Sequence, residues 1–522
     1  MTRRGKFRPK IRHNPMSKSP LARLRALPQS ESPPTCAALL LLVALLWGIQ
    51  SLLRGFWEPD EARFVYVARE MAADGHFFVP FRSGVYYAHK PPLLFWMMNI
   101  AAAPFAGHIN GFAARFPSLL GVFLSLLSTS AIADRLGGAK AAWRSVIVLS
   151  TTYLFWQVNT MAQQDALLTG LIMSAIALGT AERPSAARLF AAGFCAGAGM
   201  LLKGPVAIFI PALAIAAMKW KRGAGARVRS VLAFLAFFAG LIIPPAVWLI
   251  GAYFENPPAG YFREIIYSQT VERAGGGYGH LKGPFYFLFH FPIEFLPWTF
   301  ALVYTAVIAV RRRLRHLLRP FVWVLLIIVF FSVIPTKRNL YILAAYPPAA
   351  IIVALAWDEL QTRLPPRFLD RAAELFLALF FLAGLIVLPI VNIYKTPAGI
   401  REAVAPYLAA DQNSQARLGL VGTDGEIYAL YAGVKGMRFR PQDNPPTSPE
   451  ALSELDAFIR YIADNDSGAA VVGSGFWKEH GEKIEQNPRI TVQNLSVGKK
   501  RGDKSDKLLL WKSGGEKHGE GE

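Results

Sequence analysis

The chain has 522 residues, of which 53% are hydrophobic, and a formal net charge of +21. Apolar runs of about twenty residues, long enough to cross a hydrocarbon core of ~30 Å, recur between residues 35 and 394. They exclude a soluble globular protein, and they do not alternate as the strands of a membrane barrel do. The sequence therefore predicts a polytopic helical membrane protein.

The positive charge lies in short segments between the apolar runs. Residues 1–26 carry nine Lys or Arg and no acid, while residues 219–229 and 311–319 carry five each. Residues 54–108 hold five basic and five acidic side chains, and residues 253–289 hold three of each. Because cytoplasmic loops are enriched in Lys and Arg, this alternation predicts a cytoplasmic amino terminus and external balanced loops. The same pattern argues against nucleic acid as a partner.

The first apolar run, Thr35–Leu53, follows a basic stretch as a signal peptide would, but no small-x-small cleavage pattern comes after it. We interpret it as an uncleaved anchor that runs outward. Only two cysteines occur, Cys36 and Cys195, both inside apolar runs. They predict neither a disulfide framework nor a cysteine-ligated metal.

The segment after the first span contains two expected helices. Asp60–Ala73 is amphipathic at helical spacing. Pro91–Ala106 is apolar enough to span a membrane, but it is short and starts with two prolines. If it crossed, the basic loop Arg135–Arg144 would fall outside, against the charge bias. We therefore expect both helices to be interfacial and residues 54–114 to stay external.

About eleven spans are expected in total, which puts the carboxyl terminus outside. The later spans are predicted at Arg115–Ala133, Trp143–Thr160, Ala166–Ala181, Leu189–Leu202, Pro205–Met218, Val228–Gly251, Tyr286–Val310, Pro320–Pro335, Leu340–Leu355 and Leu375–Tyr394.

Residues 395–513 differ in character, because the apolar runs shorten. A small external α/β domain is predicted there, with a helix at Pro449–Ile462. Its strands are expected at Leu418–Val421, Ala469–Val472, Ile490–Val492 and Leu508–Trp511. The full predicted division is a basic cytoplasmic tail (1–34), a transmembrane domain (35–394), this external domain (395–513) and a disordered tail (514–522).

Ionisable side chains gather at the outer ends of the predicted spans, where a charge is costly unless it is paired or hydrated. The expected topology brings one set to the external face: Asp60, Glu61, Arg63, His89, Lys90, Asp165, Lys203, Glu272, Arg273, His280, Lys337 and Arg338. A few acids among several cations suit a reaction with a phosphate leaving group and an acceptor that needs deprotonation. We predict an active site at the water–lipid boundary.

Structural explanations remain open for several of these residues. Asp60 follows Pro59 and could simply cap a helix, and Glu61 could be an ordinary first-turn acid. Lys203 could extend its ammonium group to the interface. Lys90 is harder to explain in this way, because it precedes two prolines that stiffen the backbone. Arg63 could pair with a neighbouring acid, and His89 and His280 could be solvated loop residues.

At these residues the chain resembles the polyprenyl-phosphate-sugar-dependent integral-membrane glycosyltransferases of the GT-C type. Among them it is most similar to the lipid A aminoarabinose transferases and the protein O-mannosyltransferase-like bacterial enzymes. The resemblance runs from about residue 35 to residue 356. It rests on Trp57-Glu-Pro-Asp60-Glu61-Ala-Arg63, Arg69-Glu70-Met71, Lys90-Pro91, Asp165, Lys203-Gly204, Glu272-Arg273, His280-x-x-Gly-Pro284-Phe285-Tyr286, Leu296-Pro297-Trp298, and Ser332 to Arg338 leading into Tyr341-Ile-Leu.

The resemblance implies that Asp60 is central to catalysis. It also implies that Arg63, Lys90 and Arg273 contact the lipid-linked phosphate, with Asp165 near the sugar. The chain departs from the family pattern in two places: Ala274 stands where an aromatic residue is usual, and the stretch Ser268-Gln269 stands where a histidine is often found.

The expected function is transfer of a sugar from undecaprenyl phosphate to lipid A, lipopolysaccharide or protein at the periplasmic face of a bacterial inner membrane. The catalytic candidates are Asp60, Glu61 and Asp165; the phosphate-binding candidates are Arg63, Lys90, Lys203, Arg273, Lys337 and Arg338; His89, Glu272 and His280 complete the site. The alternatives are a transporter or lipid flippase, and a non-catalytic scaffold. No metal site or cofactor is predicted, but a divalent cation on the three carboxylates stays open.

Overall fold

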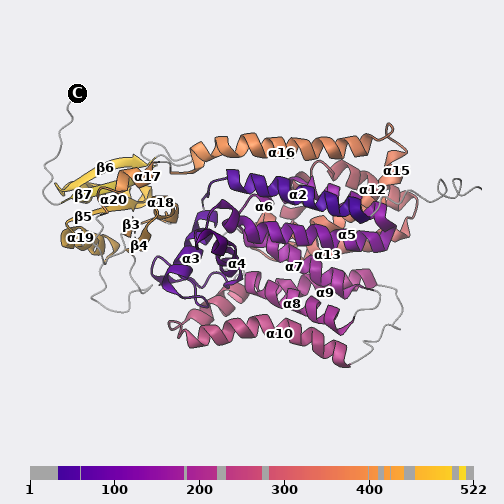
Figure 1. Ribbon diagram of the computed structural model, residues 1–522, viewed down its shortest axis with the longest axis horizontal. Helices are drawn as coiled ribbons and strands as arrows, with labels where there is room; N and C mark the ends of the chain where they lie inside the picture. Colours follow the sequence, from indigo (N-terminus) through magenta and orange to yellow (C-terminus); the bar gives the residue numbers. More distant parts are fainter. Residues whose placement is uncertain are drawn as a thin grey trace, which may run out of the picture.

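The computed structural model describes residues 33–58, 60–181, 185–219, 231–272, 281–397, 399–408, 417–423, 425–439, 453–495 and 505–512. Nearly all of the predicted basic tail (1–34) and all of the predicted disordered tail (514–522) lie outside these residues. The described chain is mostly helical and ends in a small sheet domain, in agreement with the coarse fold class that the sequence predicts (Figure 1).

The long helices lie side by side along the longest axis of the molecule, with α16 and α10 at opposite edges (Figure 1). They are α2 (Pro33–Leu53), α5 (Gly111–Ser150), α7 (Gln164–Gly179), α8 (Ala186–Lys203), α9 (Val206–Lys219), α10 (Val231–Phe254), α12 (Thr299–Arg311), α13 (Leu318–Val333), α14 (Tyr346–Leu355) and α16 (Phe368–Lys395). Helices that are apolar on all sides suit a core or a lipid environment.

Within the described residues, five helices are long and apolar enough to cross a membrane, or up to seven if two bent pairs each count as one span. The sequence predicted about eleven. One bent pair joins α6 (Tyr153–Asn159) to α7 at 115°, and the other joins α11 (Tyr286–Glu294) to α12 at 113°. The second bend interrupts the predicted straight span Tyr286–Val310. The first bend lies between the predicted spans Trp143–Thr160 and Ala166–Ala181, where the sequence predicts a turn.

The predicted spans Arg115–Ala133 and Trp143–Thr160 meet in the single element α5. This helix departs from helical geometry at Gly138, where φ is 75°. Only glycine adopts such a conformation readily, so this residue allows the chain to kink there. The second of these predicted spans also ends early, because α5 stops at Ser150 and α6 begins at Tyr153.

The segment between α2 and α5 folds into the two expected helices, α3 (Asp60–Asp74) and α4 (Leu93–Ala102). A hairpin that the sequence did not predict lies between them, formed by β1 (Phe81–Arg82) and β2 (Val85–Tyr86). A short 3-10 turn, η1 (Ala103–Phe105), follows α4.

Helices α8 and α10 approach each other through glycines. A Cβ on Gly193 would lie 2.0 Å from the carbonyl oxygen of Phe237, and one on Gly240 would lie 2.1 Å from that of Phe190. Small residues allow helix backbones to pack this closely. The contact holds α8, which ends at Lys203, against α10, a helix with many exposed apolar side chains.

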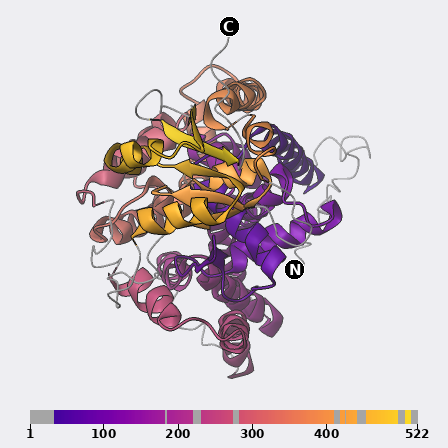
Figure 2. The same ribbon diagram turned by 90° about the vertical axis from the view of Figure 1, so that its left-hand side faces the viewer.

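The carboxy-terminal domain is a five-stranded mixed sheet with strand order β4-β3-β5-β7-β6. Its strands are β3 (Arg417–Val421), β4 (Lys435–Arg438), β5 (Ser467–Val472), β6 (Ile490–Leu495) and β7 (Asp506–Lys512). The helices are α17 (Ile400–Val404), α18 (Glu426–Ala432), α19 (Glu454–Asp464) and α20 (Ser474–Glu485). The predicted strands are present, whereas β4 and α20 were not predicted. Seen from the end of the molecule, the sheet lies in front of the helices (Figure 2).

The remaining short elements connect the helices. They are the π-helical η2 (Arg263–Glu272), η3 (Arg315–Leu317), the 3-10 helix η4 (Asn339–Ala345) and α15 (Trp357–Gln361). Of these, η2 and η4 border the cavity described next.

Candidate active site

Asp60 begins helix α3, and its carboxylate pairs with two arginines. One is Arg63, one turn further along the same helix. The other is Arg338, which lies just before η4 and donates from Nη2 to Asp60 Oδ2 at 2.6 Å. Only 7% of the Asp60 side chain is exposed. The fold thus joins two residues 278 positions apart, both of which the sequence assigned to the site.

Two opposing effects decide the protonation of Asp60. Burial alone would raise the pKa of the carboxyl, but the charges of Arg338, Arg63 and Lys90 outweigh it and hold the pKa below its ordinary value. The pKa of Arg338 moves in the opposite direction: burial would lower it, but Asp60 and Asp165 raise it. Asp60, Arg338, Lys90 and Asp165 therefore form one electrostatic unit.

Glu61, the next residue, takes part in a different set of contacts. Its Oε2 accepts from Arg54 Nη2 at 2.7 Å, and its Oε1 accepts from Arg115 Nη2 at 3.3 Å and from the amide of Ala162 at 2.7 Å. The side chain is only 2% exposed. Both oxygens are engaged with buried partners, which favours a structural role over the catalytic one expected from the sequence.

Asp165 and Lys203 form a second ion pair near the first. Asp165 lies in the first turn of α7 and Lys203 at the end of α8. The ammonium group of Lys203 also lies 4.0 Å from the centre of the Tyr341 ring, a cation–π contact. When the Gln164 amide is oriented to satisfy its neighbours, its oxygen accepts from Lys90 Nζ at 3.1 Å.

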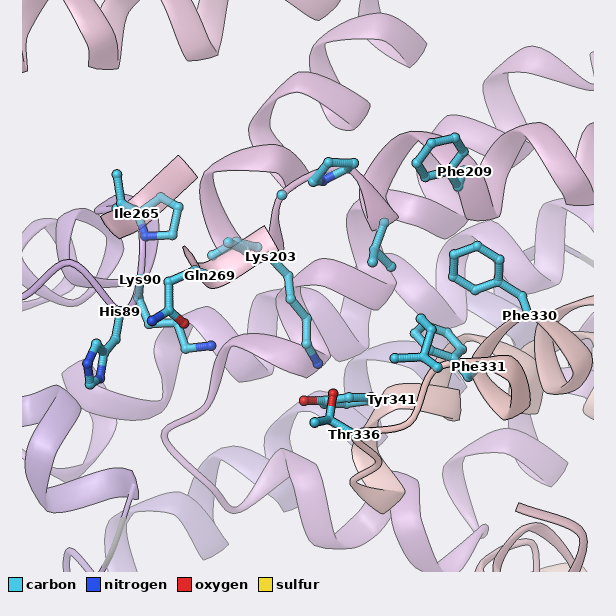
Figure 3. A pocket seen from close by; sticks show the side chains of 16 residues that line it. His89, Lys90, Lys203, Phe209, Ile265, Gln269, Phe330, Phe331, Thr336 and Tyr341 are labelled. Atoms are coloured by element: carbon cyan, nitrogen blue, oxygen red, sulfur yellow. The ribbon is translucent and has the colours of Figure 1, made fainter. Parts of the chain in front are cut away.

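A cavity of about 260 Å³ opens between these groups. One part of its lining is polar and includes His89, Lys90, Lys203, Gln269, Thr336 and Tyr341. The other part is apolar and includes Val206 and Phe209 of α9, Phe330 and Phe331 of α13, and Ile334. Figure 3 shows the amine of Lys203 beside Tyr341 and the amine of Lys90 between His89 and Lys203, with the three phenylalanines gathered to one side. The cavity therefore joins a cationic mouth to an apolar groove.

The other predicted site residues lie elsewhere or outside the described chain. His89 reaches the mouth of the cavity and faces Glu264 of η2 at 3.7 Å. Lys337 donates to the carbonyl oxygens of Ile334 and Lys282, at 2.5 and 3.1 Å, so its ammonium group binds backbone. The side chain of Glu272 and the whole of Arg273 and His280 lie outside the described residues.

The structure adds residues that the sequence analysis did not assign to the site. Arg54 and Arg115 hold Glu61, and Gln164 contacts Lys90. One signal was available for Arg115, because an arginine at the end of an apolar run needs a partner. No group of three or more His, Cys, Asp or Glu side chains that could hold a metal occurs in the part of the chain that the structure describes.

The comparisons with known proteins support the resemblance to the GT-C type glycosyltransferases that the sequence indicates, and they show that the fold is shared. Over 92% of this chain and 98% of the other, the fold matches the crystal structure of ArnT from Cupriavidus metallidurans bound to undecaprenyl phosphate, with a TM-score of 0.73 and 18% sequence identity. Residues 89–249 match the family described as dolichyl-phosphate-mannose-protein mannosyltransferase.

The chain is also similar in sequence to proteins that are named arabinosyl transferases. The chain is 30% identical over 327 residues to the undecaprenyl phosphate-alpha-4-amino-4-deoxy-L-arabinose arabinosyl transferase of Erwinia tasmaniensis. The aligned region covers 60% of this chain and 58% of that protein. It is 26% identical over 423 residues to the second such transferase of Sodalis glossinidius, covering 77% of this chain and 71% of that one. The match to the Erwinia protein thus spans little more than half of that protein's length.

Proposed function

We propose that this protein transfers a sugar from a polyprenyl-phosphate donor to an envelope acceptor. The observation that carries the proposal is the shape and chemistry of the cavity. Its cationic mouth suits a phosphate, and its apolar groove, lined by Phe209 and Phe330, suits the first isoprene units of a lipid. The names of the relatives support undecaprenyl phosphate as the lipid and aminoarabinose as one candidate sugar.

Fixed cations supply the catalytic effect in this proposal. Negative charge develops on the donor phosphate as the glycosidic bond breaks. Lys90 and Lys203 line the cavity and can stabilise this charge, because preoriented cations in a site that excludes water are more effective than water itself. Arg63 and Arg338 pair with Asp60 and do not line the cavity, but Asp60 is also under the influence of the Lys90 charge, so we keep both arginines as candidates. We retain Arg273 from the resemblance. Lys337 is a weaker candidate, since its ammonium group binds carbonyl oxygens.

The lowered pKa of Asp60 bears on the acceptor. A carboxylate that is held ionised by arginines is a poor proton acceptor, because a general base works best with a pKa near the working pH. We therefore assign Asp60 to orienting the arginines and the acceptor. A phosphate acceptor, such as lipid A, arrives without a proton to remove. This favours lipid A over a protein hydroxyl as the acceptor. Asp165 is then the candidate for contact with the sugar.

We further propose a location and a division of the chain. The helical part, residues 35–394, would lie in a bacterial inner membrane with the amino terminus in the cytoplasm, and the sheet domain within residues 395–513 would lie in the periplasm. About eleven crossings remain our expectation, with α3 and α4 at the outer interface. A divalent cation is not needed for these steps.

The test is transfer by the full chain in proteoliposomes, with labelled undecaprenyl-phosphate aminoarabinose and lipid A as substrates. We expect Lys90→Ala to weaken donor binding by about 10-fold or more, since a charge-assisted hydrogen bond contributes roughly 1.5–3 kcal/mol. Lys395→Ala, at the exposed end of α16, is the matched control and should leave transfer unchanged. Unchanged donor binding in Lys90→Ala would overturn the assignment, and translocation of the donor without transfer would instead favour a flippase.

A further inference from the structure

We infer that Glu426, in the carboxy-terminal domain, is a positioning residue for the donor site. It acts through Arg82 on the hairpin that leads to Lys90. The inference rests on the proposed function, because it assigns to the sheet domain a part in binding the donor.

The contact between Glu426 and Arg82 is a buried fork. Arg82 Nε donates to Glu426 Oε1 and Arg82 Nη2 donates to Oε2, both at 2.7 Å. Arg438 of β4 pairs with the same carboxylate from the other side. The side chain of Glu426 is 1% exposed. Bidentate pairs of this kind fix orientation as well as distance.

The hairpin is held from two sides. Arg82 ends β1, and the turn after it consists of Ser83 and Gly84, with φ of 53° and 82°. Glu70 of α3 accepts from the amides of both turn residues, at 2.7 and 2.9 Å. The hairpin therefore lies between α3, which carries Asp60, and α18, which carries Glu426. A change at either contact alters the position of the hairpin.

The hairpin leads directly into the cavity wall. The amide of Tyr87 donates to the carbonyl of Pro80 at 2.7 Å, which closes the base of the hairpin. Three residues later the chain reaches Lys90, followed by two prolines that leave little freedom to the backbone. A displacement of the hairpin should therefore also move the backbone of Lys90.

Tyr87 is a buried residue at the base of the hairpin, and the charges of both ion-pair sets influence it. It is 3% exposed, and its hydroxyl has no hydrogen-bond partner among the described residues. Burial raises the pKa of Tyr87, while Arg63 and Arg82 lower it and Asp60 and Glu426 raise it. The charges of both ion-pair sets therefore act on the same buried ring.

The buried charges around Glu426 explain why its loss should have a larger effect than the loss of an exposed ion pair between the domains. Glu426 neutralises part of the charge of two buried guanidinium groups, and without it they would repel each other. A second contact between the domains, Asp74 with Lys435, joins the far end of α3 to β4. Its side chains are 31% and 25% exposed, so solvent screens it and its loss should have little effect.

The experiment compares Glu426→Gln with Asp74→Asn in the full chain. We expect Glu426→Gln to raise KM for undecaprenyl-phosphate aminoarabinose by about 10-fold, equal to about 1.4 kcal/mol. It should also lower kcat, because a displaced Lys90 stabilises less of the charge that develops on the donor phosphate. Glu426→Asp, which keeps the charge, should recover part of this loss. Asp74→Asn should match the unmodified protein. A loss of kcat with KM unchanged, or an equal effect of Asp74→Asn, would overturn the inference.

A second readout does not depend on the reaction. A spin label at Val85→Cys, a position 48% exposed on β2, reports the mobility of the hairpin after Cys36 and Cys195 are replaced. We expect greater mobility in Glu426→Gln than in Asp74→Asn, and equal mobility would contradict the inference. If the unmodified protein transfers no sugar, the proposed function fails. The mobility comparison then decides by itself whether Glu426 holds the hairpin in place. If Glu426→Gln does not fold, Glu426→Asp provides the same comparison.

Discussion

Asp60 and Glu61 are consecutive residues, yet their carboxylates belong to separate ion-pair sets. Asp60 contacts Arg338, whereas Glu61 contacts Arg54 and Arg115. Successive residues of an α-helix point about 100° apart, since a turn takes 3.6 residues. The first turn of α3 therefore directs one acid to the candidate site and the other to the anchor that holds α3 against α2 and α5.

Replacing Glu61 by Gln should destabilise the fold. The change leaves the buried guanidinium groups of Arg54 and Arg115 without a counter-charge, and breaking a buried pair costs about 3–5 kcal/mol. The midpoint of thermal or denaturant unfolding in detergent measures this effect. Asp358→Asn is the control: it removes an ion pair to Arg144 in which the acid is 78% exposed, and should cost less than about 1 kcal/mol. A Glu61→Gln protein as stable as this control would argue for a role other than anchoring.

The pH dependence of transfer should change when Arg338 is replaced by Met. The pKa of Asp60 in the folded protein lies below its ordinary value of 3.8. The ionised carboxylate therefore contributes stability in full above that ordinary value, and the contribution is lost as the pH falls through the lowered pKa. Removing Arg338 takes away the largest lowering charge, so the pKa of Asp60 should rise and the acidic limb of the rate profile should move to higher pH.

The pH–rate profile of Arg338→Met needs a control variant in which the surroundings of Asp60 are unchanged. Lys395→Ala serves, because Lys395 lies at the exposed end of α16. Its acidic limb should coincide with that of the unmodified protein. An Arg338→Met profile that also coincides would mean that Asp60 does not control the acidic limb.

Narrowing the apolar groove should discriminate between donors of different chain length. Ile334 lines the cavity, so Ile334→Trp should raise KM for a long polyprenyl donor by about 10-fold, and less for a short-chain analogue. The neighbouring Val333 is 78% exposed, and Val333→Trp should affect neither donor. Equal effects of Ile334→Trp on both donors would place the lipid chain outside this groove.

A methyl group at Gly193 should separate α8 from α10. The added Cβ would meet the carbonyl oxygen of Phe237 at 2.0 Å, and overpacking of this kind costs about 1–3 kcal/mol. We expect Gly193→Ala to lower the unfolding midpoint. Gly48→Ala in α2 is the control, because its Cβ would meet nothing within 4 Å and a helical glycine gains about 0.5–1 kcal/mol on replacement by alanine. A stabilised Gly193→Ala protein would contradict this account of the contact.

The sequence predicted the helical class, the two helices of the first external segment and the strands β3, β5, β6 and β7. Each leaves a local signal, either a long apolar run or a short one between turn residues. It also predicted that Asp60, Arg338, Asp165 and Lys203 share a site, because the charge pattern and the motifs placed them at one face. The break between α5 and α6 and the bend between α11 and α12 were missed, since the segments on both sides of each are apolar.

Sequence alone determined which residue types stand at which ends of the apolar runs, and thus the class of protein and a list of charged candidates. Tertiary structure alone decided how those charges pair. It separated Asp60 from Glu61, turned Lys337 toward backbone carbonyls, and brought Glu426 of the sheet domain to Arg82. The physical reason is that an ion pair depends on distances of a few ångströms between residues far apart in the chain, and no local pattern records those distances.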